Sequence, residues 1–242
     1  MLQFRRMAYR REDLAVGEWF HCYTRTIDHS RPFEDKLNTE RFLEALYLAN
    51  QSSPMPVMSH LYKKNSHDDI FTLERDKPLI AIGAYVIMPT HYHLLATPLA
   101  ENGLSEFFHK VGTGFTRFYN DKQERVGNLF VKPFRSKHVS SDGYFGRVAS
   151  YIHLNPVELF EPEWKNGRVR DFLRLEKNIR NYASSSLFDY EKIKTRTQTN
   201  ILDKEARSLV ETYRIPLRES LTYAHEYYRS LELDMKLGGD AS

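Results

Sequence analysis

The segment that most constrains the fold is a long apolar run followed by a short turn and a second apolar run. Residues 79–88 are LIAIGAYVIM, and after Pro89 and Thr90 residues 91–98 are HYHLLATP. Apolar and β-branched residues on both sides of a proline-containing turn are typical of two paired strands. The sequence therefore predicts a β-hairpin, in which residues 79–88 form one strand and residues 91–98 its partner.

Two histidines interrupt the apolar character of the second strand. Side chains alternate between the two faces of a strand, so His91 and His93 share one face while Tyr92 and Leu94 point into the core. Two neighbouring imidazole nitrogens suit a divalent metal ion. The alternative is a pair of ordinary polar residues on the solvated face of a half-buried strand, because short motifs match often by chance. Either way, we expect this face of the strand to be open.

The other predicted elements complete a mixed fold. An α+β architecture follows from their order of strand, helix, two strands, helix, strand and helix, and we expect a ferredoxin-like antiparallel sheet with helices packed on it. Pro133 predicts that the last strand is bulged or lies at a sheet edge. The predicted strands are 18–27, 79–88, 91–98 and 128–139, with a weaker candidate at 68–74, and the predicted helices are 41–53, 104–125 and, after a cap at Ser141 or Asp142, 143–154.

Three units are expected along the 242 residues: a basic N-terminal arm (1–17), a main domain (18–190) and a helical C-terminal extension (191–242). The extension has two apolar stripes at helical spacing, 202–214 and 217–236, divided by Pro216. No apolar run approaches the roughly 20 residues that cross a bilayer. The N-terminus lacks the apolar segment of a secretory signal, so a cytoplasmic protein without a membrane partner is expected.

Basic residues are unevenly distributed. Residues 109–139 contain seven Lys or Arg against two acidic residues, and aromatic residues are interleaved with them. Such a stretch fits a nucleic-acid surface, with phosphate contacts beside aromatic platforms, but a solvated helix followed by a core strand explains it equally well. The candidates for DNA contacts are Arg117, Lys132, Arg135, Lys137 and, on the following helix, Arg147.

The helix predicted at 143–154, which ends at Asn155, carries a second candidate group. Tyr151 and Asn155 are four residues apart and so share one helix face. Two imidazole nitrogens and one amide oxygen would leave a divalent ion open positions for phosphate oxygens. The single cysteine, Cys22, excludes an internal disulfide and a cysteine-based metal site. The mixed nitrogen and oxygen ligands favour Mg²⁺ or Mn²⁺.

Four motifs in this order resemble the single-tyrosine HUH transposases, most closely the branch of REP-associated tyrosine transposases. They are the HxH pair, GNLFVKPFRSKHV (127–139), YIHLNPV (151–157) and NYASSSLFDY (181–190), and the resemblance covers roughly residues 15–190. It implies that His91 and His93 bind the metal, that Tyr151 is the nucleophile and that Asn155 is the third ligand. The middle residue of the HUH motif is usually aliphatic, whereas this chain has Tyr92.

The resemblance also implies an activity and a partner. It implies metal-dependent cleavage and transfer of single-stranded DNA near a hairpin, through a 5′-phosphotyrosine intermediate, in a nucleoid-associated protein. Relatives include monomers and homodimers, so the oligomeric state stays open. Two alternatives also remain: a domesticated protein that binds a DNA hairpin without cutting it, and an HxH metallohydrolase of small molecules.

Overall fold

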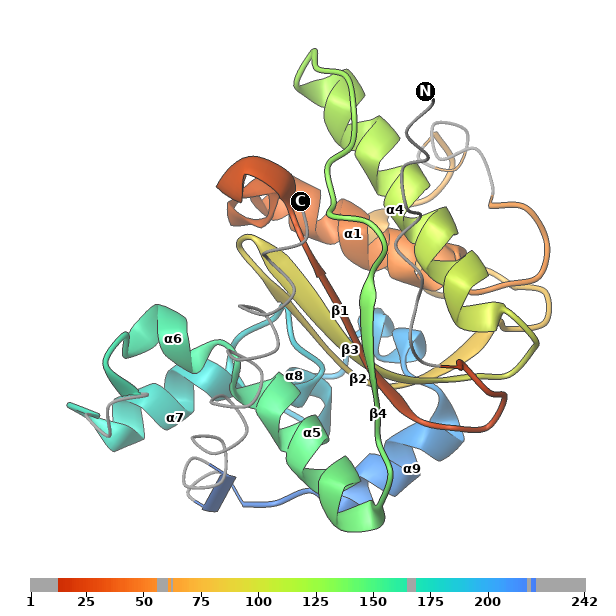
Figure 1. The fold of residues 1–242 in the computed structure, drawn as a ribbon. Helices are drawn as coiled ribbons and strands as arrows, with labels where there is room; N and C mark the ends of the chain where they lie inside the picture. Colours follow the sequence, from red (N-terminus) through yellow and green to blue (C-terminus); the bar gives the residue numbers. More distant parts are fainter. Residues whose placement is uncertain (1–12, 56–60, 62, 165–168, 217–218, 221–242) are drawn as a thin grey trace, which may run out of the picture.

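The protein is described by a computed structural model that covers residues 13–55, 61, 63–164, 169–216 and 219–220. Its centre is a four-stranded antiparallel sheet in the order β2-β3-β1-β4 (Figure 1). The bounds of the strands are β1 Phe20–Arg25, β2 Ile80–Met88, β3 His91–Pro98 and β4 Arg135–His138. The predicted hairpin is the β2–β3 pair.

Two crossover helices link these strands. Helix α1 (Lys36–Leu48) connects β1 to β2, and α4 (Gly103–Lys122) connects β3 to β4. Because β3 lies between β1 and β2, and β1 lies between β3 and β4, the two crossovers are interlocked in the β-α-β-β-α-β pattern. The expected α+β fold of the ferredoxin-like kind is therefore confirmed.

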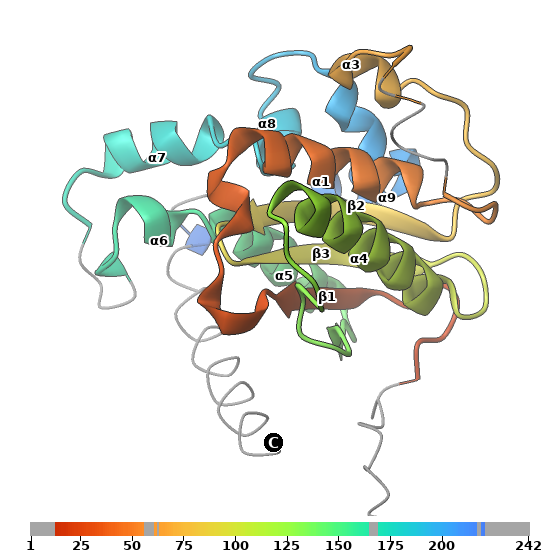
Figure 2. The same ribbon diagram turned by 90° about the horizontal axis from the view of Figure 1, so that it is seen from above.

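One face of the sheet is covered by α1 and α4 (Figure 2). Its centre is the ring of Phe42, which is 4.6 Å from the Tyr92 ring and 5.0 Å from the Phe115 ring between centroids. Phe33 and Phe130 also pack against Phe42. These aromatic side chains bury a large apolar area, which makes this face the main hydrophobic core.

The opposite face of the sheet is covered by α5 (Asp142–Leu154) and α9 (Lys204–Tyr213) (Figure 1). Helix α5 begins after Ser141, whose hydroxyl accepts a hydrogen bond from the Tyr144 amide. The two helices approach closely at Gly146, where a Cβ atom would lie 2.4 Å from the Tyr213 carbonyl oxygen. Only a residue without a Cβ allows this approach.

Two predicted strands differ from the structure. Residues 68–74 do not form a strand, because Ser66 and Asp69 form a reciprocal capping box that starts the helical turn α3 (His67–Ile70). The strand predicted at 128–139 is shortened to β4, because Pro133 has no amide hydrogen to donate to a ladder. Upstream of Pro133, Phe130 makes only an isolated bridge to Thr26.

Several short helices surround this framework. The described part of the predicted extension contains η4 (Thr197–Ile201) and α9. Residues 1–12 of the predicted arm and residues 221–236 of the last predicted helix lie outside the described residues. No helix in the described ranges is long and apolar enough to cross a membrane. The short helices are η1 (Ile27–His29), η2 (Pro32–Glu34), α6 (Val157–Phe160), α7 (Phe172–Arg180), α8 (Leu187–Tyr190) and η4 (Thr197–Ile201).

Candidate active site

The two histidines of β3 lie beside a second set of polar side chains from β1. Across the antiparallel pair, His93 faces Tyr23 and His91 faces Arg25. Residues directly opposite each other point to the same face of a sheet, and so do residues two apart on one strand. His21 therefore joins this group, and the α5 face of the sheet carries three histidines.

Helix α5 covers these side chains with Tyr151. The Tyr151 ring packs edge-on against the His21 ring at 5.5 Å and against the His93 ring at 5.6 Å, measured between centroids. Tyr151 and His93 are 6% and 5% exposed, and His21 is fully buried. The expectation of an open strand face is therefore wrong at His93, because a helix packs on it. Only His91, at the start of β3, is half-buried.

The His93 ring is the centre of this cluster. Besides Tyr151, it contacts the rings of His21 at 5.0 Å, His91 at 5.1 Å and Tyr23 at 5.5 Å. The cluster thus joins β1, β3 and α5 in one continuous set of aromatic contacts. The predicted metal ligands and the predicted nucleophile are brought together.

Hydrogen bonds orient both candidate metal ligands. His93 Nδ1 is 2.9 Å from His21 Nε2, and His91 Nδ1 is 3.0 Å from the hydroxyl oxygen of Thr90. In each ring the Nδ1 atom is engaged by a neighbouring polar group, as it is in metal-binding histidines that use Nε2 as the ligand. The two rings therefore fit a metal ion.

Burial also sets the protonation of this pair. It lowers the pKa of His21 to about 3, with a smaller contribution from the positive charge of Lys137. The pKa of His93 is lowered well below its ordinary value, first by burial and then by the neighbouring His21 and His91. Both rings are neutral at physiological pH, and a neutral imidazole is the form that binds metal.

Asn155 ends α5 next to Tyr151. Its Nδ2 atom donates a hydrogen bond of 3.0 Å to the Tyr151 carbonyl oxygen, which leaves the amide oxygen as a possible ligand. Burial and, next, the charge of Glu158 raise the pKa of the Tyr151 phenol, and a hydrogen bond from the Asn155 side chain opposes them. Burial has the larger effect, so the pKa is raised overall and the phenol is protonated.

The predicted metal-ligand set consists of His91, His93 and Asn155. Among the described residues, no group of three His, Cys, Asp or Glu side chains is arranged to hold a metal ion. The predicted set has only two members of those types, His91 and His93, and its third member is an amide. Solvent or phosphate oxygens would have to complete the coordination of a Mg²⁺ or Mn²⁺ ion.

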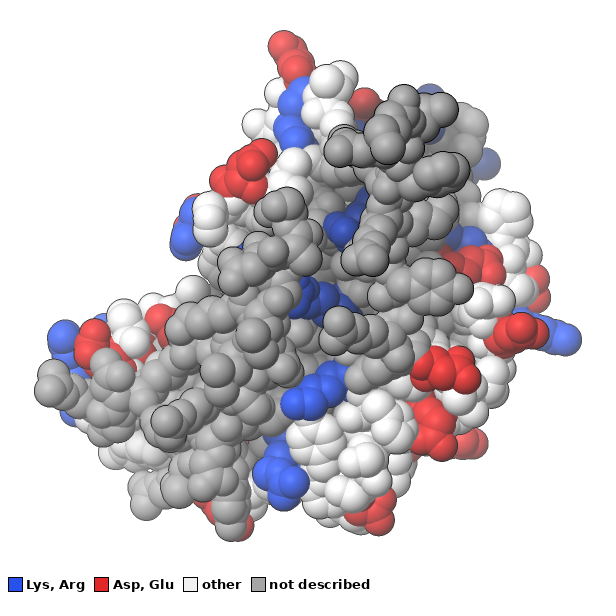
Figure 3. Space-filling view, viewed as in Figure 1, with Lys and Arg blue, Asp and Glu red and all other residues white. Residues whose placement is uncertain are grey.

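Three of the predicted DNA-binding residues lie beside the cluster. On β4, Arg135 pairs with Tyr23 and Lys137 with His21, so both point to the α5 face. Arg147 is exposed on α5, and its guanidinium carbon and the Lys137 Nζ atom each lie 5.8 Å from the ring centre of Tyr144. Figure 3 looks at the β4 edge of the sheet and shows Lys and Arg side chains near the middle of the view, where β4 and α5 lie in Figure 1.

The other two predicted DNA-binding residues lie elsewhere. Arg117 is exposed on α4, on the opposite side of the sheet. Lys132 is exposed in the segment before β4, at a cavity of about 320 Å³ that Tyr92, Phe108 and Phe134 also line. The structure therefore does not bring Arg117 or Lys132 to the Tyr151 cluster.

His21, Tyr23 and Arg25 are the site residues that sequence analysis missed. They alternate in the first predicted strand, so the sequence indicates that they share a face. Their proximity to the HxH pair depends on the pairing of β1 with β3, which no local pattern specifies. The alternation of the three residues is visible in the sequence, but only the strand order shows that they lie beside His91 and His93.

Comparison with known proteins shows a distant structural similarity. No protein-family model and no curated protein sequence matches the chain. The fold is similar to a solved structure described as a REP-associated tyrosine transposase bound to a REP hairpin. The TM-score is 0.47 at 14% sequence identity, and the alignment covers 79% of this chain and 90% of that one.

Proposed function

We propose that the protein is a metal-dependent single-stranded-DNA endonuclease and strand transferase that acts near DNA hairpins. The observation that carries the proposal is the contact of the Tyr151 ring with the His93 ring, 5.6 Å between centroids, beside His91 and Asn155. A potential nucleophile and two oriented imidazoles in one cluster suit attack on a metal-bound phosphate. The transposase motifs of the sequence agree with this chemistry.

His91 and His93, through Nε2, and Asn155, through its amide oxygen, would hold Mg²⁺ or Mn²⁺. When bound, the ion supplies polarisation of the scissile phosphate and stabilises the charge that develops on it. Because all three ligands are neutral, the ion keeps its full charge for the phosphate. The hydrogen bonds of His21 and Thr90 hold the two imidazoles in their ligand orientation.

Tyr151 would then attack the phosphorus atom. The bond from its phenol oxygen to phosphorus forms as the bond to the 3′ oxygen breaks, and the phenol proton is balanced by protonation of the leaving 3′ oxygen. The products are a 5′-phosphotyrosine and a free 3′-hydroxyl. Since the phosphotyrosine keeps the bond energy, another 3′-hydroxyl can reverse the step and join strands without ATP.

The strand would reach Tyr151 along the basic edge of the sheet. Arg135 and Lys137 on β4 and Arg147 on α5 border the cluster and offer phosphate contacts. Within one chain, the Tyr151 ring contacts the His93 ring, the His93 ring contacts the His91 ring, and Asn155 is hydrogen-bonded to the Tyr151 carbonyl. This supports a site that does not need a second subunit, whether or not the protein also forms a homodimer.

A second candidate function has one observation in its favour. Tyr151 is nearly buried, and its phenol has a raised pKa, so it is poorly activated for attack. A domesticated protein that binds a DNA hairpin without cutting it would have no need of an activated phenol. The two candidates share the basic surface and differ only in the chemistry of Tyr151.

One assay separates them. Labelled single strands with a hairpin are incubated with the protein and Mn²⁺, and a denaturing gel is used to detect a protein–DNA adduct. The strand transferase gives an adduct that is lost in Tyr151→Phe and kept in the matched control Tyr144→Phe. Hairpin binding without any adduct in the wild type identifies the binding protein instead. An adduct that survives Tyr151→Phe shows that the nucleophile is another residue.

A further inference from the structure

The cluster under α5 is closed at one end and open at the other. Along β1, His21 is fully buried, Tyr23 is half-buried and Arg25 is exposed. The neighbouring strand shows the same gradient, since His93 is 5% exposed and His91 is half-buried. Arg25 and His91 are direct partners across the β1–β3 pair, so the open ends of both strands coincide. This end is therefore where a phosphate from solvent meets the cluster.

Arg25 belongs to the sheet face that contains the two candidate metal ligands of β3. Opposite residues of an antiparallel pair project to the same face, with Cβ atoms about 5 Å apart. The Arg25 side chain therefore starts next to His91, which shares its face with His93. Its guanidinium group is a planar fork of N–H donors, and this shape matches the non-bridging oxygens of a phosphate.

The backbone around Arg25 is anchored on both sides. The Val131 amide donates to the Arg25 carbonyl oxygen at 2.9 Å, and the Thr26 amide donates to the Thr90 carbonyl oxygen at 2.8 Å. The hydroxyl oxygen of the same Thr90 is 3.0 Å from His91 Nδ1. Thr90 thus holds the end of β1 and orients the ring opposite Arg25, which is the support that a catalytic group needs.

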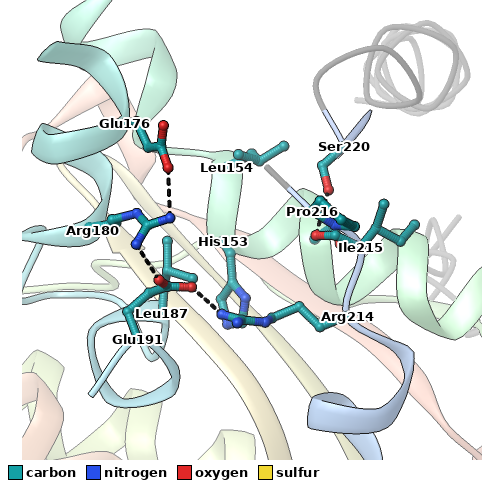
Figure 4. Close-up of a pocket in the computed structure, with 11 residues that line it drawn as sticks. His153, Leu154, Glu176, Arg180, Leu187, Glu191, Arg214, Ile215, Pro216 and Ser220 are labelled. Atoms are coloured by element: carbon teal, nitrogen blue, oxygen red, sulfur yellow. Dashed lines mark hydrogen bonds and ion pairs between the residues drawn. The ribbon is translucent and has the colours of Figure 1, made fainter. Parts of the chain in front are cut away.

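The charge of Arg25 is not neutralised by any part of the chain that the structure describes. Within those residues its side chain forms no ion pair and no hydrogen bond. By contrast, Arg180 and Arg214 line a cavity of about 430 Å³ between α5 and α7 and are paired (Figure 4). Arg180 contacts Glu176 at 2.6 Å and Glu191 at 2.7 Å, and Arg214 also pairs with Glu191. The charges of those arginines are used within the fold, whereas Arg25 can pair with a bound anion.

We propose that Arg25 binds the scissile phosphate at the open end of the cluster and stabilises the negative charge that develops on its non-bridging oxygens when Tyr151 attacks. The assignment rests on the proposed strand-transfer function and adds a catalytic residue to it. Charge increases on these oxygens as the new phosphorus–oxygen bond forms, and a fixed cation beside them lowers the barrier. Arg135 and Lys137 on β4 then hold flanking phosphates, whereas Arg25 holds the reacting one.

The rate of adduct formation in a single turnover tests this role. With saturating hairpin strand and Mn²⁺, Arg25→Ala should form the protein–DNA adduct at least about 100-fold more slowly, because a donor to the developing charge is lost. Arg25→Lys keeps the charge but loses the fork, so its rate should lie between those of the wild type and Arg25→Ala. A rate for Arg25→Ala within about threefold of the wild-type rate overturns the proposal.

The matched control is Arg174→Ala. Arg174 is also exposed, but it lies on α7, whose main contacts are with α6 and α8. This variant removes the same charge and the same side chain away from the cluster, and it should form the adduct at the wild-type rate. An equal loss of rate in Arg174→Ala and Arg25→Ala would reflect net charge alone and overturns the proposal.

A structural role of Arg25 would appear in two other measurements. Because the side chain is exposed, Arg25→Ala should keep the melting temperature of the wild type. It should also keep the Mn²⁺ affinity, measured by titration without DNA, since Arg25 is not a metal ligand. A fall in either quantity together with the rate would mean that Arg25 acts through the fold or through His91, and it overturns the proposal.

Binding of the same hairpin strand distinguishes failure of this inference from failure of the proposed function. In the Tyr151→Phe background, which lacks the proposed nucleophile, Arg25→Ala should reduce the slope of log affinity against log salt by about 0.7, and Arg174→Ala should not. If the wild type forms no adduct but this slope is reduced, strand transfer fails and the phosphate contact of Arg25 stands. An unchanged slope overturns the phosphate contact, whether or not the wild type forms an adduct.

Discussion

The two faces of the same sheet differ in what they bury. On β1 and β3, Cys22 and Tyr92 point to α1 and α4, whereas Tyr23 and His93 point to α5. The first face is covered by closely packed aromatic side chains, with Phe42 at their centre. The second face is also covered by a helix, but it buries imidazole nitrogens and a phenol oxygen.

This difference assigns separate tasks to the two faces. Apolar side chains need close packing but no hydrogen-bond partners. The α1 and α4 face therefore contributes mainly to the free energy of unfolding. Buried nitrogen and oxygen atoms must be hydrogen-bonded, and the His21–His93 contact meets that need at some cost in stability. The α5 face therefore keeps groups that can bind a metal and react, supported by the opposite face.

The largest expected effect is on the apolar face. Phe42 is fully buried and contacts four other aromatic rings, so Phe42→Ala should lower the free energy of unfolding by about 3–5 kcal/mol. Equilibrium unfolding in urea measures it. A loss below about 1 kcal/mol would contradict the assignment of Phe42 to the centre of the core.

The two histidines of β3 should respond differently to truncation. His93→Ala leaves His21 Nε2 buried without its partner and should cost about 1–3 kcal/mol of stability, whereas half-buried His91→Ala should cost less than about 1 kcal/mol. Both variants should lose Mn²⁺ binding and DNA cleavage. Urea unfolding and Mn²⁺ titration are the measurements. Equal destabilisation with intact Mn²⁺ binding would make the pair structural.

Two glycines sharpen the comparison between the helices of the two faces. Gly146→Ala should lower stability by about 1–3 kcal/mol, because its Cβ atom would meet the Tyr213 carbonyl oxygen between α5 and α9. Gly112→Ala on α4 meets nothing within 4 Å and should raise stability by about 0.5–1 kcal/mol. Melting temperatures of the two variants should therefore shift in opposite directions. Stabilisation by Gly146→Ala would show that α9 does not pack closely on α5.

Much of this organisation is contained in local patterns. The apolar run before Pro89 predicts β2, and alternation in β3 predicts that His91 and His93 share a face. Ser141 or Asp142 is predicted as the cap of α5, and the structure has Ser141 there. These features depend on residues a few positions apart. The fold class follows because the order of the elements leaves few ways to pair the strands.

The rest depends on contacts between distant segments. The register that sets Tyr23 opposite His93, 70 positions later, is not encoded in either strand alone. For that reason His21, Tyr23 and Arg25 were not predicted as site residues, and the burial of His93 under α5 was not expected. The roles of Tyr151, His91, His93 and Asn155 in catalysis and metal binding stay predictions that the proposed variants test.

The smallest expected effect concerns the basic residues on the two sides of the sheet. Arg135 lies on β4 beside the cluster, whereas Arg117 is exposed on α4 across the sheet. If single-stranded DNA follows the α5 face, Arg135→Ala removes a phosphate contact and should reduce the slope of log affinity against log salt by about 0.7. Arg117→Ala should leave that slope unchanged. Fluorescence anisotropy of a labelled hairpin strand over a range of salt concentrations measures both slopes. Because each variant removes one positive charge, a general effect of net charge would change both slopes alike. A reduced slope for Arg117→Ala alone would move the DNA path to the α4 side of the sheet, away from Tyr151.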